Sequence, residues 1–126
     1  MRLLLDTAIL IHSVAAPELL TKRVTAMLED EANVLEVSAM SISEIAIKAA
    51  RGKLRLSPET IRQALDDMDI RVLPYTAEHA YVLFAIPRHH GDPFDRQIIA
   101  QAMAEEIPVV TSDRVFRLYK NLTVIC

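Results

Sequence analysis

The chain has 126 residues, a formal net charge of −3 and a hydrophobic fraction of 52%. These values suit one domain over residues 1–126 with a single core, and they exclude a disordered chain. The acidic balance argues against a protein that grips nucleic acid by bulk positive charge. No segment resembles an export signal or a membrane span, and Cys126 is the only cysteine, so we expect a cytoplasmic protein without disulfides or membrane attachment.

Short apolar runs alternate with amphipathic stretches along the whole chain. The apolar runs predict strands at residues 2–5, 34–37, 70–73, 107–111 and 122–125. The amphipathic stretches predict helices over residues 17–32, 41–52 and 77–85, and further helices that begin near residues 57, 92 and 112. This alternation is typical of an α/β fold in which a mostly parallel sheet is covered by helices on both faces.

Four acidic residues fall where such a fold places its ligands. Asp6 directly follows the first predicted strand, and Asp113 comes shortly after the fourth. Glu44 and Asp95 fall in the first turns of two predicted helices. Ligands of open α/β sheets bind beyond the carboxyl ends of the strands. We therefore expect the four carboxylates to lie at one edge of the sheet.

Each acid also has a purely structural explanation. An aspartate after a strand often caps the helix that follows it. Ser41 and Glu44 match the capping box S-x-x-E, and Glu44 precedes Lys48 by the four residues that favour a surface ion pair. Asp92 and Asp95 read as a helix cap and a first-turn acid favoured by the helix dipole. Taken singly, these residues leave both interpretations open.

Two features favour a shared site. Asp95 stands three and four residues before Ile98 and Ile99, so it lies on or beside a buried stripe, where an unpaired charge is costly. Four converging carboxylates would also repel one another, and an all-carboxylate site suits Mg²⁺ or Mn²⁺ rather than zinc. The adjacent His89 and His90 are poorly spaced to share an ion, so a polar loop is expected there.

Several other enzyme classes lack their motifs here. The sequence contains no G-x-x-x-x-G-K-[ST] loop, no G-x-G-x-x-G turn and no G-x-S-x-G elbow. A haloacid-dehalogenase-like phosphatase would need a second aspartate two residues after Asp6, and Ala8 occupies that position. A phosphate-accepting receiver domain would need an acidic pair ahead of the first strand's terminal aspartate, which is absent.

Four segments resemble a known family, the PIN domain, and specifically the VapC-like ribonuclease toxins of type II toxin–antitoxin systems. The segments are LLLDT at residues 3–7, SISEIAIK at 41–48, DPFDRQIIAQA at 92–102 and TSD at 111–113. Their order and spacing match over nearly the whole chain, and the third segment is the most specific. The resemblance implies a three-layer sandwich with a central, mostly parallel twisted sheet of four to five strands flanked by helices.

The resemblance also implies an activity and partners. It implies an endoribonuclease that depends on Mg²⁺ or Mn²⁺ and leaves a 5′-phosphate and a 3′-hydroxyl. A cognate antitoxin and a homodimer are the implied protein partners. Which RNA is cut cannot be read from these residues, because RNA is recognised largely by shape and by exposed bases. An inactive PIN-like module that acts only through protein or RNA partners is the alternative, and the intact set of acids argues against it.

Site roles follow from the same match. The residues implied to bind the metal and catalyse are Asp6, Glu44, Asp95 and Asp113. The residues implied to orient these carboxylates or to contact RNA are Thr7, Ser41, Asp92, Arg96, Ser112 and Arg114. A basic run from Lys48 to Arg55 could contact phosphate, but it could equally be a solvated face at a helix end.

Overall fold

A five-stranded sheet, with every neighbouring pair of strands parallel, forms the centre of the computed structural model, which describes residues 1–126. Its strand order is β3-β2-β1-β4-β5. The strands are β1 (Arg2–Leu5), β2 (Val34–Ser38), β3 (Ile70–Leu73), β4 (Val109–Val110) and β5 (Val124–Ile125). The parallel sheet expected from the sequence is thus confirmed.

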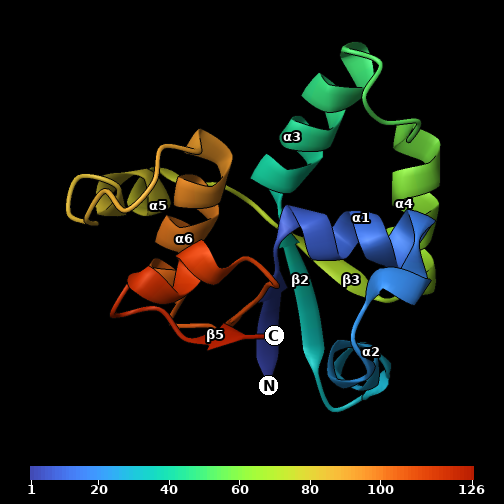
Figure 1. Cartoon of the computed structure of the whole chain (residues 1–126), viewed down its shortest axis with the longest axis horizontal. Helices are drawn as coiled ribbons and strands as arrows, with labels where there is room; N and C mark the ends of the chain where they lie inside the picture. The colour runs from blue at the N-terminus through green and yellow to red at the C-terminus, as the bar shows by residue number, and fades with distance from the viewer.

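Helices cover both faces of this sheet, which makes three layers (Figure 1). The helices are α1 (Thr7–Ala15), α2 (Lys22–Glu29), α3 (Ala39–Ala50), α4 (Pro58–Asp67), α5 (Ala77–Val82) and α6 (Pro93–Glu105), with short 3-10 turns η1 (Pro17–Leu19) and η2 (Arg114–Leu118). None of the helices combines the length and the hydrophobicity that crossing a membrane requires.

The central strand β1 shows why the first apolar run is continuous. Leu3 and Leu5 pack into a core cluster shared with α1, α2, α3 and α4. Leu4 points to the other face and packs into a second cluster, which includes Phe116 and Tyr119. A parallel strand covered on both faces has no solvent side, so its residues need not alternate between apolar and polar.

The helix predicted over residues 17–32 is shorter in the structure, and a further helix precedes it. The structure forms α1 from residue 7 to 15, then η1, then α2 from residue 22 to 29. Asp6 caps α1 by accepting the Ile9 N–H at 2.8 Å, and Thr21 caps α2 by accepting the Val24 N–H at 3.1 Å. Each cap satisfies backbone donors at a helix start, so α2 begins only after Thr21, and the residues from Pro17 to Leu19 form a separate 3-10 turn.

The capping box predicted at Ser41 is also wrong. The helix α3 begins at Ala39, and its cap is Ser38, whose hydroxyl accepts the Met40 N–H at 2.9 Å. Ser41 is therefore buried inside α3, and Glu44 lies in the second turn rather than the first. The S-x-x-E pattern is present, but an equally good cap lies three residues earlier.

Several elements are shorter than predicted, and β5 spans only Val124 and Ile125 instead of residues 122–125. The helix α5 ends at Val82 rather than near residue 85, and β4 spans only Val109 and Val110 instead of residues 107–111. Glu106 follows α6 in the left-handed region with φ of 55°, and Pro108 comes two residues later. The chain is therefore still turning where the apolar pattern predicts a strand.

An ionic network around the buried Glu36 joins the sheet to α5 and α6. Glu36 of β2 is 5% exposed and accepts hydrogen bonds from Arg2 Nε at 2.7 Å and Nη2 at 3.0 Å. Arg2 also donates to Glu105 at 3.2 Å, and His79 Nε2 lies 3.1 Å from the other oxygen of Glu105. The bond with His79, and then the bond with Arg2, hold the pKa of Glu105 below its ordinary value.

Replacing Arg2 tests how much this network stabilises the fold. Arg2→Ala leaves the Glu36 carboxylate buried without its guanidinium, so we expect the free energy of unfolding to fall by about 2 kcal/mol in urea titrations. Arg71→Ala is the control, because Arg71 is exposed on β3 and makes no ion pair. Equal losses in the two variants would contradict the expectation, and adding Glu36→Leu to Arg2→Ala should recover part of the loss.

Candidate active site

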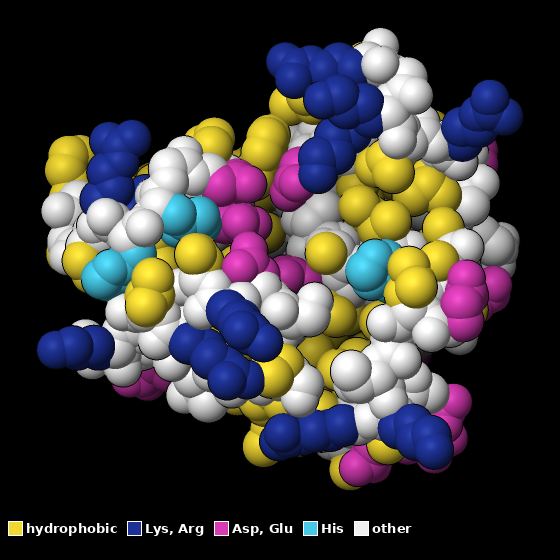
Figure 2. All heavy atoms as spheres, in the orientation of Figure 1, with side chains coloured by type: hydrophobic (Ala, Val, Ile, Leu, Met, Phe, Trp, Pro, Cys, Tyr) yellow, Lys and Arg dark blue, Asp and Glu magenta, His cyan; other side chains and the backbone are white.

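Four acids that are distant in sequence line a single hollow of about 260 Å³. Asp6 follows β1, Glu44 comes from α3, Asp95 from the first turn of α6, and Asp113 caps η2 after β4. Asp92, the cap of α6, lines the same hollow. Acidic side chains gather at the centre of this face between α3 and α6 (Figure 2).

Asp6 is held by two hydrogen bonds. It is 4% exposed, with one oxygen accepting the Ile9 N–H at 2.8 Å and the other accepting the hydroxyl of Thr111. The Thr111 hydroxyl oxygen also accepts the Asp113 N–H at 3.0 Å. Thr111 therefore orients Asp6 and fixes the loop that carries Asp113, the role that the sequence reasoning gave to the neighbouring Ser112.

The Thr7 hydroxyl does not orient a carboxylate, which corrects the expectation for that residue. It donates to the Ser41 hydroxyl at 2.9 Å, and both residues are buried. This bond joins the start of α1 to α3, so the two side chains set the spacing of the helices that carry Asp6 and Glu44. Ser112 lines the hollow but makes no side-chain hydrogen bond.

Glu44 carries the clearest sign that a ligand is needed. The residue is 7% exposed, and its Oε2 pairs with Lys48 Nζ at 2.7 Å. Its Oε1 is buried and has no hydrogen-bond partner. A buried carboxylate oxygen without a donor is costly, and a cation in the hollow would satisfy it. The ion pair predicted with Lys48 is present, but its acid is buried rather than on a free surface.

Asp95 contacts a residue that the sequence reasoning did not place in the site. His90 Nε2 lies 3.4 Å from Asp95 Oδ2, and His90 Nδ1 lies 2.8 Å from the Tyr119 hydroxyl. The expected polar loop is thus partly folded back onto α6. No sequence signal fixes this contact, because it depends on how the loop packs against Tyr119.

Burial and mutual repulsion perturb two of the carboxylates. Burial, followed by the charges of Asp92, Glu44, Asp6 and Asp113, raises the pKa of Asp95 to about 7. Burial also raises the pKa of Asp6, against its hydrogen bonds, and the charges of Asp113 and Glu44 add to the rise. The hollow therefore favours binding of a proton or a cation.

The carboxylates line the same hollow, but they are not arranged as a coordination shell around one point. No three of the acidic, histidine or cysteine side chains stand close enough together to hold a metal as they are arranged. The donor set nevertheless fits a hard divalent cation, since all of its members are carboxylates and one oxygen is buried without a partner. Small rotations of exposed carboxylates such as Asp113 would be required to complete a coordination shell.

A family model for the PIN domain matches residues 3–122. The chain belongs to the PIN domain family. The family expected from the sequence motifs is therefore confirmed. None of the curated proteins compared with the chain matches its sequence.

Solved structures of VapBC complexes contain chains that are similar to this PIN domain. A chain of VapBC2 from Rickettsia felis, bound to a promoter DNA fragment, has a TM-score of 0.75 at 16% identity and covers 99% of this chain and 98% of its own. A chain of DNA-bound VapBC from Salmonella typhimurium has a TM-score of 0.73 at 17% identity, with coverages of 99% and 97%. A chain of VapBC-1 from nontypeable Haemophilus influenzae reaches 0.66 at 20% identity, with coverages of 99% and 97%. At these identities the likeness establishes the fold, and it confirms the predicted three-layer sandwich.

The two arginines expected to contact RNA differ in their surroundings. Arg96 Nη1 donates to the Pro87 carbonyl at 3.0 Å and to the Tyr119 hydroxyl at 3.3 Å. Arg96 therefore braces the loop before α6 and does not line the acidic hollow. Arg114 is exposed beside Asp113 without a hydrogen bond or ion pair, and its contact with RNA stays a prediction.

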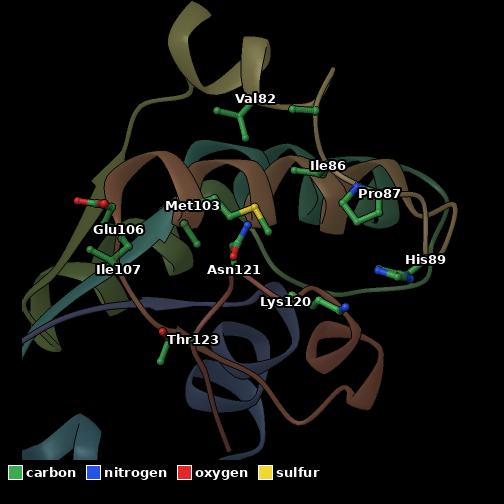
Figure 3. A pocket seen from close by; sticks show the side chains of 12 residues that line it. Val82, Ile86, Pro87, His89, Met103, Glu106, Ile107, Lys120, Asn121 and Thr123 are labelled. Atoms are coloured by element: carbon green, nitrogen blue, oxygen red, sulfur yellow. The ribbon is translucent and has the colours of Figure 1, made fainter.

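A hollow much larger than the acidic one lies away from the four acids (Figure 3). Its volume is about 920 Å³, and it lies between the end of α5, α6 and the chain that leads into β5. Apolar side chains such as Ile86 and Met103 form much of its wall, and Lys120 lies near one end. None of the four acids lines it, so size alone does not locate the chemistry of this domain.

Because the pKa of Asp95 is raised, removal of its charge should stabilise the fold by an amount that depends on pH. The folded-state pKa of about 7 exceeds the ordinary value of 3.8, so the ionised carboxylate destabilises the metal-free fold increasingly as pH rises through this interval. We expect Asp95→Asn to raise the melting temperature by about 4 °C at pH 8 and by less at pH 5. The shift at pH 8 corresponds to a gain in the free energy of unfolding of about 1 kcal/mol, which allows for solvent screening of the charge.

Calorimetry in EDTA at both pH values measures this difference. Glu31→Gln is the control, because Glu31 is exposed in the loop before β2 and makes no ion pair. A lower melting temperature for Asp95→Asn at pH 8 would show that the carboxylate stabilises the empty site, contrary to this account.

Proposed function

We propose that this PIN domain, as a single unit over residues 1–126, is a divalent-metal-dependent endoribonuclease and the toxin of a VapBC-like type II system. The observation that carries the proposal is the buried, partnerless Oε1 of Glu44 in a hollow that three other acids share. Structural carboxylates that only cap helices would have no reason to converge on a buried position of this kind.

The proposed ligands follow from the hollow. Asp6 and Asp95 would bind Mg²⁺ or Mn²⁺, with Glu44 and Asp113 acting directly or through water. A cation bound there would lower the pKa of a bound water and neutralise negative charge on a phosphodiester. The proposal draws support from the donor chemistry, because carboxylates alone select Mg²⁺ or Mn²⁺ over softer metals.

The chain's own residues prepare this site in separate ways. Thr111 holds the Asp6 carboxylate in one orientation, and Lys48 does the same for Glu44. Asp95, with a pKa near 7, gives up its proton as the site fills, so occupancy is expected to rise with pH. An inactive binding module would need none of these constraints, so we place catalysis ahead of that alternative.

Replacing Asp6 tests the proposed chemistry. Asp6→Asn keeps the size and capping ability of the side chain but removes a charged ligand. We expect it to lower the rate of RNA cleavage with Mg²⁺ by more than about a hundredfold, because even residues that only support metal ligands contribute about 10–100-fold. Gel assays of a 5′-labelled single-stranded RNA measure the rate, and the wild-type products should carry a 5′-phosphate.

The matched control is Asp66→Asn, which removes an exposed acid of α4 far from the hollow in sequence and outside its lining. It should cleave as wild type does. Full cleavage by Asp6→Asn, or wild-type activity undiminished in excess EDTA, would contradict the mechanism.

We also propose a cognate antitoxin, a homodimer and a cytoplasmic location, where RNA and antitoxin are made. The similar solved chains come from complexes named VapBC, which supports a protein partner. Tyr81 and Phe84 around the end of α5 are 63% and 91% exposed, and such aromatic surface supports self-association.

Co-expression with the small protein that the proposal expects to be encoded next to this gene tests the partners together. The small protein should co-purify, silence RNA cleavage and relieve growth arrest, and light scattering of the free chain should give about twice the mass of one copy. High-level expression of the free chain without toxicity would contradict the toxin function. A wild-type chain with the measured mass of one copy, and the same mass for Phe84→Ser, would contradict the dimer.

A further inference from the structure

A second hollow continues outward from the acidic one. It has a volume of about 340 Å³ and shares Glu44, Lys48 and Asp92 with the first. The residues that line only the second hollow are Ile47, Arg51, Lys53, Pro93 and Phe94. The path from the carboxylates therefore runs between the outer end of α3 and the first turn of α6.

The basic wall of this path is fixed by the way in which α3 ends. Gly52 takes φ of 72°, its N–H bonds to the Ala49 carbonyl at 3.0 Å, and the Lys53 N–H bonds to the Lys48 carbonyl at 2.9 Å. This is the Schellman arrangement, which folds the chain back at the helix end and keeps Arg51 and Lys53 beside the hollow. A positive φ favours glycine here.

The charges on this wall are not neutralised. Arg51 and Lys53 are exposed and make no ion pair or side-chain hydrogen bond. Figure 2 shows Lys and Arg side chains gathered over the outer end of α3, next to the acidic centre. In a chain with net charge −3, this is a local positive surface directly beside the site that would hold the cation.

Apolar side chains complete the lining of this hollow, and one of them carries an aromatic ring. Phe94 is half-buried in the first turn of α6, and its N–H is held by Asp92 Oδ1 at 2.9 Å. Ile47 on α3 is 43% exposed and lines the same hollow. An aromatic side chain and unpaired cations that line one hollow are the combination with which proteins bind single-stranded nucleic acid.

We propose that this second hollow, the α3–α6 groove, is the track along which a single RNA strand runs to or from the carboxylates. Arg51 and Lys53 contact its phosphates and Phe94 stacks on an unpaired base. This inference rests on the proposed function and specifies how the RNA substrate is held. A paired duplex keeps its bases stacked inside the helix, so the aromatic wall favours a single strand. An acidic protein segment would use the cations but would leave the ring without a base.

RNA binding by the full chain in EDTA tests this without catalysis. Fluorescence anisotropy with a labelled single-stranded RNA of about a dozen nucleotides gives affinities over a series of KCl concentrations. The Arg51→Ala/Lys53→Ala variant should bind about tenfold more weakly at 50 mM KCl, with a salt slope smaller by about 1.4, since each single-strand phosphate contact contributes about 0.7. Lys22→Ala/Arg23→Ala on α2 removes the same charge elsewhere and is the matched control.

The aromatic contact has its own test. Phe94→Leu should weaken binding by about fivefold or more without changing the salt slope, and Phe94→Tyr should bind as wild type does. Melting temperatures near that of wild type establish that each variant is folded. A double-stranded RNA of the same sequence should bind more weakly than the single strand.

Three outcomes would overturn the inference. One is equal loss of affinity in the Arg51/Lys53 and Lys22/Arg23 variants, and another is undetectable RNA binding by the wild-type chain. The third is normal RNA binding by the groove variants together with lost affinity for the co-expressed antitoxin. Groove-dependent binding without any metal-dependent cleavage would leave the inference standing and refute the proposed nuclease, so the two failures are distinguishable.

Discussion

Negative charge gathered in one small hollow is the constraint on which the rest of this site depends. The topology produces this gathering, because β1 and β4 are adjacent and parallel, Asp6 directly follows β1, and Asp113 comes three residues after β4. The pKa values of Asp6 and Asp95 rise because the fold buries both groups among other acids. A protein without a cation for this hollow would gain stability by losing one of its carboxylates.

Ion pairs elsewhere in the fold offset the cost of burying carboxylates that repel one another. In the ionic network around Glu36, that buried carboxylate is paired with Arg2, and the partly exposed carboxylate of Glu105 contacts both Arg2 and His79. Both charged regions lie next to β1 and α6. The carboxylates of the network have charged partners, whereas the acidic hollow contains a buried carboxylate oxygen without a partner. A cluster of carboxylates without cations does not stabilise the fold, so its presence on a well-packed sheet is better explained by function.

Much of this architecture can be read from the sequence, because it follows from patterns of fixed period. The continuous apolar run at residues 2–5 predicts a buried central strand, and strand-end position predicts where Asp6 and Asp113 converge. The errors come where local signals compete. The S-x-x-E motif competes with a cap at Ser38, and a single apolar stripe hides the boundary that Thr21 creates.

The supporting side chains of the site are harder to predict for a different reason. Thr111 orients Asp6 across two adjacent strands, and His90 reaches Asp95 only because its loop packs on Tyr119. These contacts depend on tertiary packing, which carries no periodic signal. Arg96 illustrates the reverse case, since closeness in sequence to Asp95 does not bring it to the acidic hollow.

The central claim is that carboxylates from separate segments share one divalent ion. The most direct measurement is anomalous diffraction from a crystal of the wild-type protein soaked in Mn²⁺ at pH 8. We expect one or two strong peaks bounded by Asp6 and Asp95, with Glu44 Oε1 turned towards them. Peaks confined to other surfaces, with Asp6 and Asp95 left without a metal at saturating Mn²⁺, would contradict the account.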